Sequence, residues 1–327
     1  MFHCAVEMRP ADMPTTTPDS CAPHHIVVIG GMNMDITAAS ANVLLAADSN
    51  PGRIHCAPGG VGRNVAENLA RFGHVVDLVS AVGSDAFGTR LLEATGRVGV
   101  CTRWVATLPG QRTASYLSVH GPDGDMAVAV NDMDILEQLS PELLMLRVAD
   151  VKGAACVVLD ANLRQDSLQW LLDSVRPQWA FVDAVSVAKC SRLAPCLAGI
   201  HTLKVNRMEA KALTGLPADT PGAAQHAAQA LHNAGVRHVV VSMGAEGVAW
   251  CDETGNTAYR KARTVAVAST SGAGDALLAG LVHGHLAGWT LDEAIPFAMQ
   301  CAEMTLSSPF ANHPLLSVEA VQHEQNS

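Results

Sequence analysis

The chain has 327 residues, 49% of them hydrophobic and only 16% charged, which is enough to bury a large core and leaves little for long disordered charged tails. Its formal net charge is −10, and no segment approaches the roughly 20 consecutive apolar residues of a transmembrane helix, so we expect neither nucleic acid nor a membrane as a partner. The nine cysteines are scattered and form no C-x-x-C pair, a pattern that indicates reduced thiols in a cytoplasmic protein.

The N-terminal half begins with residues 1–23, whose Pro and Thr content and lack of periodicity predict a disordered leader that is not a signal peptide. The β-branched run "HHIVVIGG" then predicts a buried first strand over residues 24–31. Further elements are expected in this order: an exposed hairpin over 32–58, a helix over 62–73, a strand over 75–83, a helix over 87–99 and a second hairpin over 113–130.

The second half alternates short apolar strands with helices. Strands are expected over 155–161, 179–185, 199–205 and 237–244, and helices over 168–175, 207–215 and 221–235. The last helix has Thr220 as N-cap, Pro221 at its first position and Gly235 as C-cap. This alternation predicts an α/β fold with a parallel sheet, helices on both faces and ligands at the carboxyl ends of the strands. The two hairpins do not fit it, and we expect them to form a small β appendage over that edge.

Two common nucleotide-binding motifs are absent from the chain. There is no G-x-x-x-x-G-K-[ST], and the first expected strand is followed by "IGGMNMD" rather than by G-x-G-x-x-G. These absences disfavour a P-loop NTPase and a dinucleotide-binding domain. Two glycine-rich stretches, "PGGVGRN" at 58–64 and "SMGAEGV" at 242–248, fit either an ordinary turn or a close approach of the backbone to a ligand.

A third glycine-rich stretch, "SGAGD" at 271–275, leads directly into an apolar, helix-like run. At a helix N-terminus, the backbone N–H groups of Gly272, Ala273 and Gly274 would form an anion site without any cationic side chain. Asp275 is then either the N-cap of the helix or a general base for a hydroxyl group that attacks a bound phosphoryl group.

Two polar pairs follow predicted strands. Asn206 and Glu209, in "KVNRMEA", lie one helical turn apart and suit a hydrated Mg²⁺ ion or its phosphate ligands, or else a solvated helix start. Asn33 and Asp35 lie just past the first strand, at the expected ligand edge, where the alternative is a pair of Asx turns.

In this order, these stretches resemble the ribokinase-like (PfkB-type) family of carbohydrate and nucleoside kinases, from about His25 to about Leu316. The stretch "PGGVGRNVAENLARFG" is similar to the first family signature, "STSGAGDALLAGLVHG" to the second and "KVNRMEA" to the N-x-x-E motif. The resemblance is closest to the branch that acts on the C-nucleoside pseudouridine, through "DSNPGRIHCAPGGVGRNVAENLA", "TASYLSVHGPDGDMAVAVNDMDI", "FVDAVSVAKC" and "AMQCAEMTLSS". Ribokinases usually have Lys where this chain has Val61, which argues against free ribose as the substrate.

The resemblance implies a three-layer ribokinase-like fold with a mostly parallel central sheet, helices on both faces and a small β lid. It assigns residues 24–35, 58–112 and 132–318 to the α/β kinase core with the nucleotide and catalytic site. Residues 36–57 and 113–131 would form the lid over the substrate site, and residues 319–327 a C-terminal tail. A homodimer through the lid is also implied.

Roles for single residues follow from the same resemblance. Asp275 would deprotonate the acceptor hydroxyl group, while the amide groups of Gly272, Ala273 and Gly274 would hold the charge on the transferred phosphoryl group. The implied substrate contacts are Asn33, Asp35, Gly59, Gly60 and Asn64, with Tyr116 and Asn131 on the lid side. The implied nucleotide contacts are Asn206, Ser242, Gly244 and Gly247, with Glu209 holding Mg²⁺ through water.

The resemblance therefore implies Mg²⁺- and ATP-dependent phosphorylation of the 5′-hydroxyl group of pseudouridine. Many relatives also have an Asp six residues before the base, where it contributes to a monovalent-cation site. This chain has Ser269 at that position, so Ser269 and Ser271 mark a cation site with one negative charge fewer, and we expect weaker dependence on K⁺. The alternatives are another nucleoside or ribose-like sugar kinase of the family, or a non-catalytic nucleoside-binding protein on the same fold.

Overall fold

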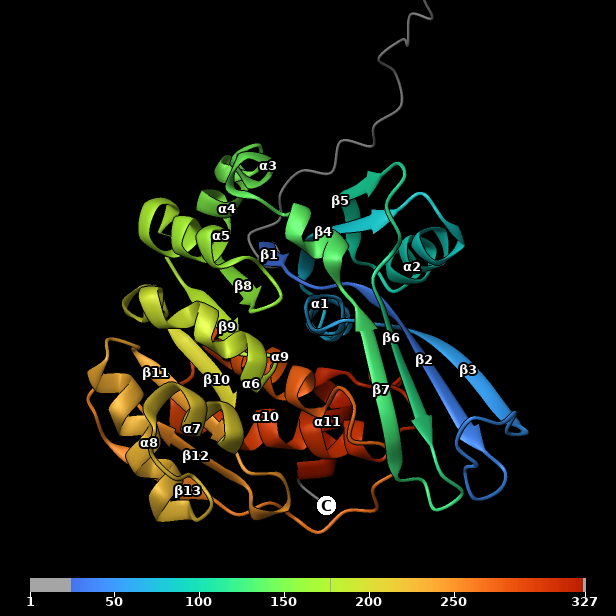
Figure 1. Ribbon diagram of the computed structural model, residues 1–327. Coiled ribbons are helices and arrows are strands. Elements are labelled where there is room, and N and C mark those ends of the chain that lie inside the picture. Colours follow the sequence, from blue (N-terminus) through green and yellow to red (C-terminus); the bar gives the residue numbers. More distant parts are fainter. Residues whose placement is uncertain (1–24, 177, 326–327) are drawn as a thin grey trace, which may run out of the picture.

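The computed structural model describes residues 25–176 and 178–325, and the leader expected over residues 1–23 lies outside them (Figure 1). The larger of two sheets has nine strands in the order β13-β12-β11-β10-β9-β8-β1-β4-β5. Its strands are β1 (His25–Ile29), β4 (Val75–Gly83), β5 (Cys101–Leu108), β8 (Cys156–Asp160), β9 (Ala180–Asp183), β10 (Thr202–Asn206), β11 (His238–Ser242), β12 (Val248–Cys251) and β13 (Thr257–Arg260). The strands from β11 to β5 are parallel, and β12 and β13 add an antiparallel edge.

Helices cover both faces of this sheet (Figure 1). One face carries η1 (Asp134–Gln138), α3 (Pro141–Met145), α4 (Val148–Gly153), α5 (Gln165–Gln169), η2 (Trp170–Val175), α6 (Val187–Cys190), η3 (Ser191–Gly199), α7 (Arg207–Thr214) and α8 (Pro221–Asn233). The other carries α1 (Val61–Arg71), α2 (Ala86–Arg97), α9 (Ala273–Leu286), α10 (Leu291–Leu306) and α11 (Val318–Gln325).

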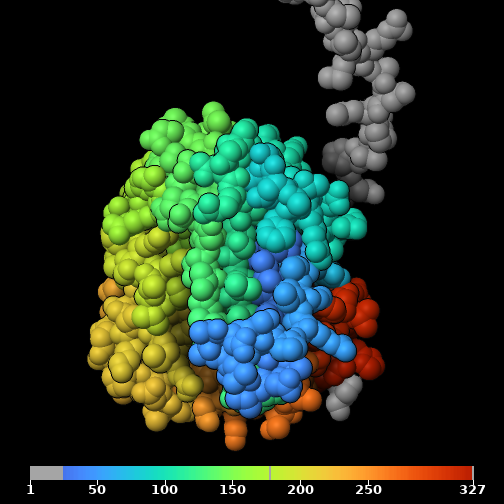
Figure 2. Space-filling model, turned by 45° about the vertical axis from the view of Figure 1, so that its right-hand side comes forward, coloured from blue at the N-terminus to red at the C-terminus, as the bar shows by residue number. Residues whose placement is uncertain are grey.

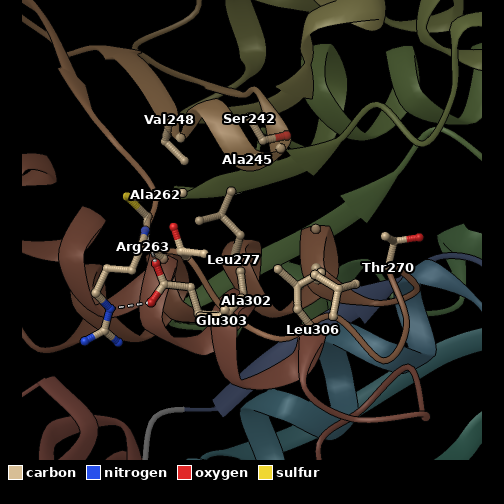
Figure 3. Close-up of a pocket in the computed structure, with 18 residues that line it drawn as sticks. Ser242, Ala245, Val248, Ala262, Arg263, Thr270, Leu277, Ala302, Glu303 and Leu306 are labelled. Atoms are coloured by element: carbon tan, nitrogen blue, oxygen red, sulfur yellow. Dashed lines mark hydrogen bonds and ion pairs between the residues drawn. The ribbon is translucent and has the colours of Figure 1, made fainter. Parts of the chain in front are cut away.

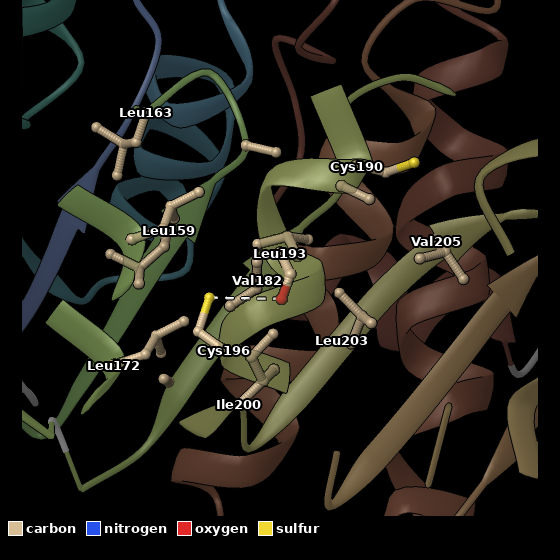
Figure 4. Packing of buried hydrophobic residues seen from close by; sticks show 14 of the residues in the cluster. Leu159, Leu163, Leu172, Val182, Cys190, Leu193, Cys196, Ile200, Leu203 and Val205 are labelled. Carbon is tan, nitrogen blue, oxygen red and sulfur yellow. Dashed lines mark hydrogen bonds between the residues drawn. The ribbon is translucent and has the colours of Figure 1, made fainter. Parts of the chain in front are cut away.

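The apolar strands are explained by burial on both faces. In β1, Val27 and Ile29 point into the first core, while Ile26 and Val28 point into the second, and all four are fully buried. Because successive side chains of a strand point to opposite faces, a strand between two helical layers is apolar throughout. Figure 4 shows the first core where β8, β9 and β10 meet η3.

The two expected hairpins combine into one smaller sheet, which consists of β2 (Asn33–Ser40), β3 (Gly52–Gly59), β6 (Ser115–His120) and β7 (Met126–Asp132) in the order β3-β2-β6-β7. Each hairpin is antiparallel, and β2 joins β6 in parallel. Since β2 follows β1 directly, this sheet starts at the carboxyl edge of the larger one, and Figure 2 shows it (blue and green) along the front of the molecule.

Several expected boundaries differ from the structure. The helix expected over 168–175 is α5 followed by the π-helical turn η2, which ends at Arg176 in a left-handed conformation. Thr220 caps α8 as expected, but the C-cap is Ala234, one residue before Gly235. The segment 319–327, expected as a tail, is helical in α11 as far as Gln325, and residues 326–327 lie outside the described part. Among the strands, β5, β12 and β13 were not expected, and neither was the turn η4 (Gly244–Glu246).

The seven cysteines in the described part of the chain are free thiols. Within residues 25–176 and 178–325, no helix has both the length and the apolar character needed to cross a membrane.

Candidate active site

Charged and amide side chains gather at the carboxyl ends of neighbouring parallel strands. Asp160 ends β8, Asp183 ends β9, and Lys204 lies near the end of β10, each of them buried. Buried charges are rare in proteins unless they are paired or functional. These buried charges therefore mark the carboxyl edge of the sheet as the candidate ligand site, as the sequence predicts.

The "SGAGD" stretch forms the N-terminus of α9 at this edge. The N-cap is Gly272, in a left-handed conformation with φ +77°, and a Cβ atom there would overlap the carbonyl oxygen of Ala311. No described side chain caps this end, so the amide groups of the first turn face outward as an anion site. Asp275 is the third residue of the helix, and the interpretation of Asp275 as the N-cap is wrong.

Asp275 is a buried carboxyl group, with only 8% of its surface exposed. Its Oδ2 atom accepts a hydrogen bond of 2.9 Å from Nδ2 of Asn64, near the start of α1. Burial, and then the nearby charge of Asp183, raise the pKa of Asp275 to about 7, against the opposing effects of Lys204 and Asn64. A carboxyl group whose pKa lies near neutral pH is suited to act as a general base.

The side chain of Lys204 places a positive charge at the anion site. This residue was not expected from the sequence. Its Nζ atom lies 3.0 Å from Oδ2 of Asp183, and a Cβ atom on Gly274 would come within 2.6 Å of it. Burial disfavours the ammonium, yet Asp183, Glu209 and Asp275 together raise the pKa of Lys204, so it stays charged. The available signal was a charged residue between the apolar Leu203 and Val205 in an expected buried strand.

Asn206 and Glu209 form a capping box at the start of α7. Oδ1 of Asn206 accepts from the amide groups of Met208 and Glu209, and the Glu209 carboxylate accepts from the backbone and side-chain N–H groups of Asn206 at 2.8 and 2.7 Å. Glu209 is 1% exposed, so a solvated helix start is wrong for it, and burial raises its pKa.

The carboxylates near Lys204 are the candidate ligands for the expected Mg²⁺ ion. Within the described part of the chain, no three His, Cys, Asp or Glu side chains are arranged to hold a metal ion by themselves. Magnesium usually keeps several waters and binds through one or two carboxylates together with substrate phosphates. The carboxylate of Glu209, which interacts with Lys204 at the anion site, fits an ion that arrives with a nucleotide.

A cavity of about 460 Å³ extends from this anion site towards α10 (Figure 3). Its walls include Val248, Leu277, Ala302 and Leu306, which suit a flat apolar ring. The same cavity contains the expected nucleotide residues Ser242, Gly244 and Gly247, as well as Ala273 and Gly274. Asn206 does not line this cavity, but it is paired with Ser242, which does, in the register of β10 and β11.

The expected substrate residues lie on the other side of Asp275, at the base of the smaller sheet. Asn33 and Asp35 lie on β2, joined by a hydrogen bond of 2.6 Å, so Asx turns are wrong for them. Asp35 is paired with Tyr116 on β6, which is paired with Asn131 on β7, and these three form one row across the sheet. Burial raises the pKa of Asp35.

The glycines at the end of β3 bring α1 close to this row. Gly59 is paired with Asn33, and a Cβ atom on it would overlap the Asp35 carboxylate. Gly60, with φ +100°, is the N-cap of α1 and lies against the backbone of Gly31. These contacts place Asn64 between the row and Asp275.

Asp160 is a second residue that the sequence analysis missed. Its Oδ2 atom accepts from the amide groups of Gly31 at 2.7 Å and Gly62 at 2.9 Å. The carboxylate thereby fixes the glycine turn after β1 against the first turn of α1. A single carboxylate at the end of the apolar run "CVVLD" was the signal.

The two serines of the expected cation site lie in the loop before α9. The amide group of Ser271 donates to Oγ of Ser269 at 3.2 Å, and the amide group of Ala268 donates to the carbonyl oxygen of Leu306 at 2.8 Å. No carboxylate stands at position 269, so any ion here would rely on neutral oxygen ligands.

Comparison with known proteins identifies the same family that the sequence motifs resemble. The profile described as pfkB family carbohydrate kinase matches residues 23–317. The chain is 39% identical to the pseudouridine kinase of Escherichia coli (strain K12), over 91% of this chain and 95% of that protein. It is 27% identical to the guanosine-inosine kinase of Exiguobacterium acetylicum, over 86% and 94% of the two chains. The structure of Arabidopsis thaliana ribokinase complexed with ribose and ATP has the same fold, with a TM-score of 0.83 at 22% identity over 94% and 99% of the two chains.

Proposed function

The chain belongs to the pfkB family of carbohydrate kinases, and we propose that it transfers the γ-phosphoryl group of ATP to the 5′-hydroxyl group of pseudouridine. The fold is ribokinase-like, as the sequence predicts, and the protein is a phosphotransferase with an alcohol group as acceptor. One observation supports the proposed phosphoryl transfer most directly. The buried Asp275, the first turn of α9 and Lys204 meet between the cavity and the row on the smaller sheet.

In the proposed reaction, Asp275 accepts the proton of the acceptor hydroxyl group while that oxygen attacks the γ-phosphorus atom. The bond from the γ-phosphorus to the bridging oxygen breaks, and ADP leaves with the electron pair. The amide groups of Gly272, Ala273 and Gly274, together with Lys204, stabilise the charge on the transferred group. The protonated Asp275 then returns its proton to solvent.

ATP would occupy the cavity with its base between Val248 and Leu277 and its phosphates towards α9. Ser242, Gly244 and Gly247 would contact the nucleotide, and Asn206 its phosphates. Bound with ATP, Mg²⁺ supplies charge neutralisation on the β- and γ-phosphates. Glu209 would hold it through water. A K⁺ ion near Ser269 and Ser271 would act more weakly, for lack of a carboxylate.

The acceptor would lie on the other side of Asp275. Asn33, Asp35, Asn64 and the backbone at Gly59 and Gly60 would bind the sugar hydroxyl groups. The row continues through Tyr116 to Asn131, on the side where the base of a nucleoside would lie. The 39% identity to a pseudouridine kinase supports pseudouridine as that nucleoside, and Val61 argues against free ribose.

We also propose that residues 36–57 and 113–131 act as a lid and join two copies of the chain. One face of the smaller sheet is apolar across its strands: Ile36 is paired with Cys56 and Leu117, and Leu117 with Val130. Val130 is 62% exposed, and exposed apolar sheet faces of this kind favour association. A cytoplasmic location is proposed from the cysteine pattern.

The test is an ADP-release assay with pseudouridine, uridine, adenosine and ribose in parallel. We expect the highest kcat/KM with pseudouridine, because its base alone among the four acceptors carries a second ring N–H donor, at the position where uridine has a C–H group. A higher kcat/KM with another acceptor would contradict the pseudouridine assignment and favour the second candidate, another nucleoside or sugar kinase. An uncharacterized sugar kinase of Escherichia coli (strain K12) that is 36% identical supports that candidate. Binding of pseudouridine without turnover would instead identify a non-catalytic nucleoside-binding protein.

A further inference from the structure

Arg63, in the first turn of α1, carries a buried guanidinium group next to Asn64, the hydrogen-bond partner of Asp275, and only 5% of its side chain is exposed. Its ion pair partner is Glu67, one helical turn further on. The remaining hydrogen bonds of its guanidinium go to Oγ1 of Thr95 (3.3 Å), the carbonyl oxygen of Pro58 (3.4 Å), Oδ1 of Asn64 (3.0 Å) and Oδ1 of Asn312 (3.0 Å). The charge is thus compensated by the ion pair with Glu67 and by the nearby charge of Asp35, and the hydrogen bonds other than those to Glu67 go to neutral oxygen atoms.

The contacts of Arg63 decide how two amide side chains are oriented. A guanidinium group has only N–H donors, so any amide that faces it must present its oxygen atom. Asn64 and Asn312 both turn Oδ1 towards Arg63. The N–H donors of Asn64 therefore point the other way, and Nδ2 of Asn64 meets Oδ2 of Asp275 at 2.9 Å.

Asn312 reaches this site from the segment that follows α10. Its Nδ2 atom donates to the carbonyl oxygen of Asn64 at 2.9 Å and to Oδ1 of Asn68 at 2.8 Å. Asn312 is 7% exposed, and its neighbour Ala311 lies against Gly272, the N-cap of α9. The two adjacent residues thus touch Asn64 and the N-cap of the helix that carries Asp275.

We propose that Arg63 and Asn312 are positioning residues that keep the side-chain N–H group of Asn64 hydrogen-bonded to Asp275. This hydrogen bond holds the carboxylate of Asp275 in place and keeps it able to accept a proton. This inference rests on the proposed role of Asp275. Neither residue touches the nucleotide cavity, and neither takes part in the proton transfer.

The consequence concerns ionisation of the base. Besides Asn64, Asp275 faces the carboxylates of Asp160 and Asp183, which disfavour its charged form, and the ammonium of Lys204, which favours it. An Asn64 amide released by its neighbours can rotate and present Oδ1 to Asp275. The carboxylate then loses a donor and gains a repulsive oxygen, so its pKa rises further.

The test uses Asn312→Ala and Arg63→Met, with Ser317→Ala as the matched control. Ser317 lies in the same C-terminal segment, where its Oγ atom accepts from the amide group of Ala320, remote from Asn64. In Asn312→Ala we expect the acid limb of the kcat/KM profile to move up by about one pH unit, a tenfold loss at low pH. KM for ATP should stay unchanged, and Ser317→Ala should keep the wild-type profile.

A uniform fall of kcat/KM at all pH values, with the limb in place, would mean that Asn312 has only a structural role and would overturn the proposal. A second readout needs no turnover, namely the ¹³C NMR titration of the Asp275 carboxyl group, assigned with Asp275→Asn. The titration should move to higher pH in both Asn312→Ala and Arg63→Met, and an unmoved titration refutes the inference. If no acceptor is phosphorylated, the proposed function fails while the titration still decides this inference.

Discussion

Replacing Asp275 by Asn tests the environment of the base through the pH dependence of stability. Burial raises the pKa of Asp275 from its ordinary 3.8 to about 7, so the folded protein holds this proton more tightly than the unfolded chain does. The folded state is fully stable with respect to this group below pH 3.8, and it loses stability as the pH rises towards 7. An Asn at this position has no charge to bury, and its oxygen can still accept the hydrogen bond from Asn64.

The size of the effect follows from the separation of the two pKa values. A shift from 3.8 to about 7 corresponds to an upper limit of roughly 4 kcal/mol in the free energy of unfolding. We therefore expect Asp275→Asn to be more stable than the wild type by about 2 to 4 kcal/mol at pH 8. At pH 5 this difference in stability should be smaller by about 1 to 2 kcal/mol. The same variant should lower kcat by about 10²- to 10⁴-fold, because the general base is lost.

The assay is urea unfolding of both proteins at pH 5 and pH 8, with Asp219→Asn, which replaces an exposed carboxylate, as the matched control. The control should show the same small difference at both pH values. If the Asp275→Asn difference is also independent of pH, then Asp275 is not in a desolvated site and the reasoning fails. Substantial residual kcat would separately refute its role as the base.

Three further predictions concern other parts of the molecule. Ser269→Asp should steepen activation by K⁺ in a salt titration against Na⁺, since it adds the missing carboxylate, and an unchanged response would exclude a cation there. His201 has a pKa lowered to about 3 by burial and by His238, so the wild type should lose roughly 2 kcal/mol of stability between pH 7 and pH 5. His201→Gln should lose less over that interval, as measured by urea unfolding. Val130→Lys should halve the mass seen by light scattering, because it places a charge on the proposed dimer face; an unchanged mass contradicts that interface.

The sequence predicted the layers of the fold because their signals are local. The alternation of apolar strands and helices, the glycine stops and the turn residues of "GPDGD" each depend on a few neighbouring residues. The two antiparallel strands β12 and β13 were missed because their short segment carries little periodicity. The helix expected over 168–175 was placed approximately, but its π-helical turn depends on packing against η3.

The site was predictable only where one segment carries its own chemistry. Asp275 lies in a recognisable glycine-rich turn. The role of Lys204, by contrast, depends on its contacts with Asp183 on the neighbouring strand and with Gly274 on α9. Arg63 likewise resembles an ordinary polar residue at a helix start, and its role depends on Asn312 in the segment after α10. Such pairings arise from topology, which a single sequence read without a template does not provide.

The contact of Ala311 and Asn312 with the first turn of α9 has a consequence for how the protein is made. Synthesis runs from the N-terminus, so a ribosome that has released the chain only as far as the end of α10 has already exposed both glycine-rich signatures and every expected site residue. That nascent chain still lacks the last side chain of the network around Asp275. The network around Asp275 is therefore complete only once the segment after α10 has been made, and a chain cut after Leu306 would retain every signature yet lack Asn312.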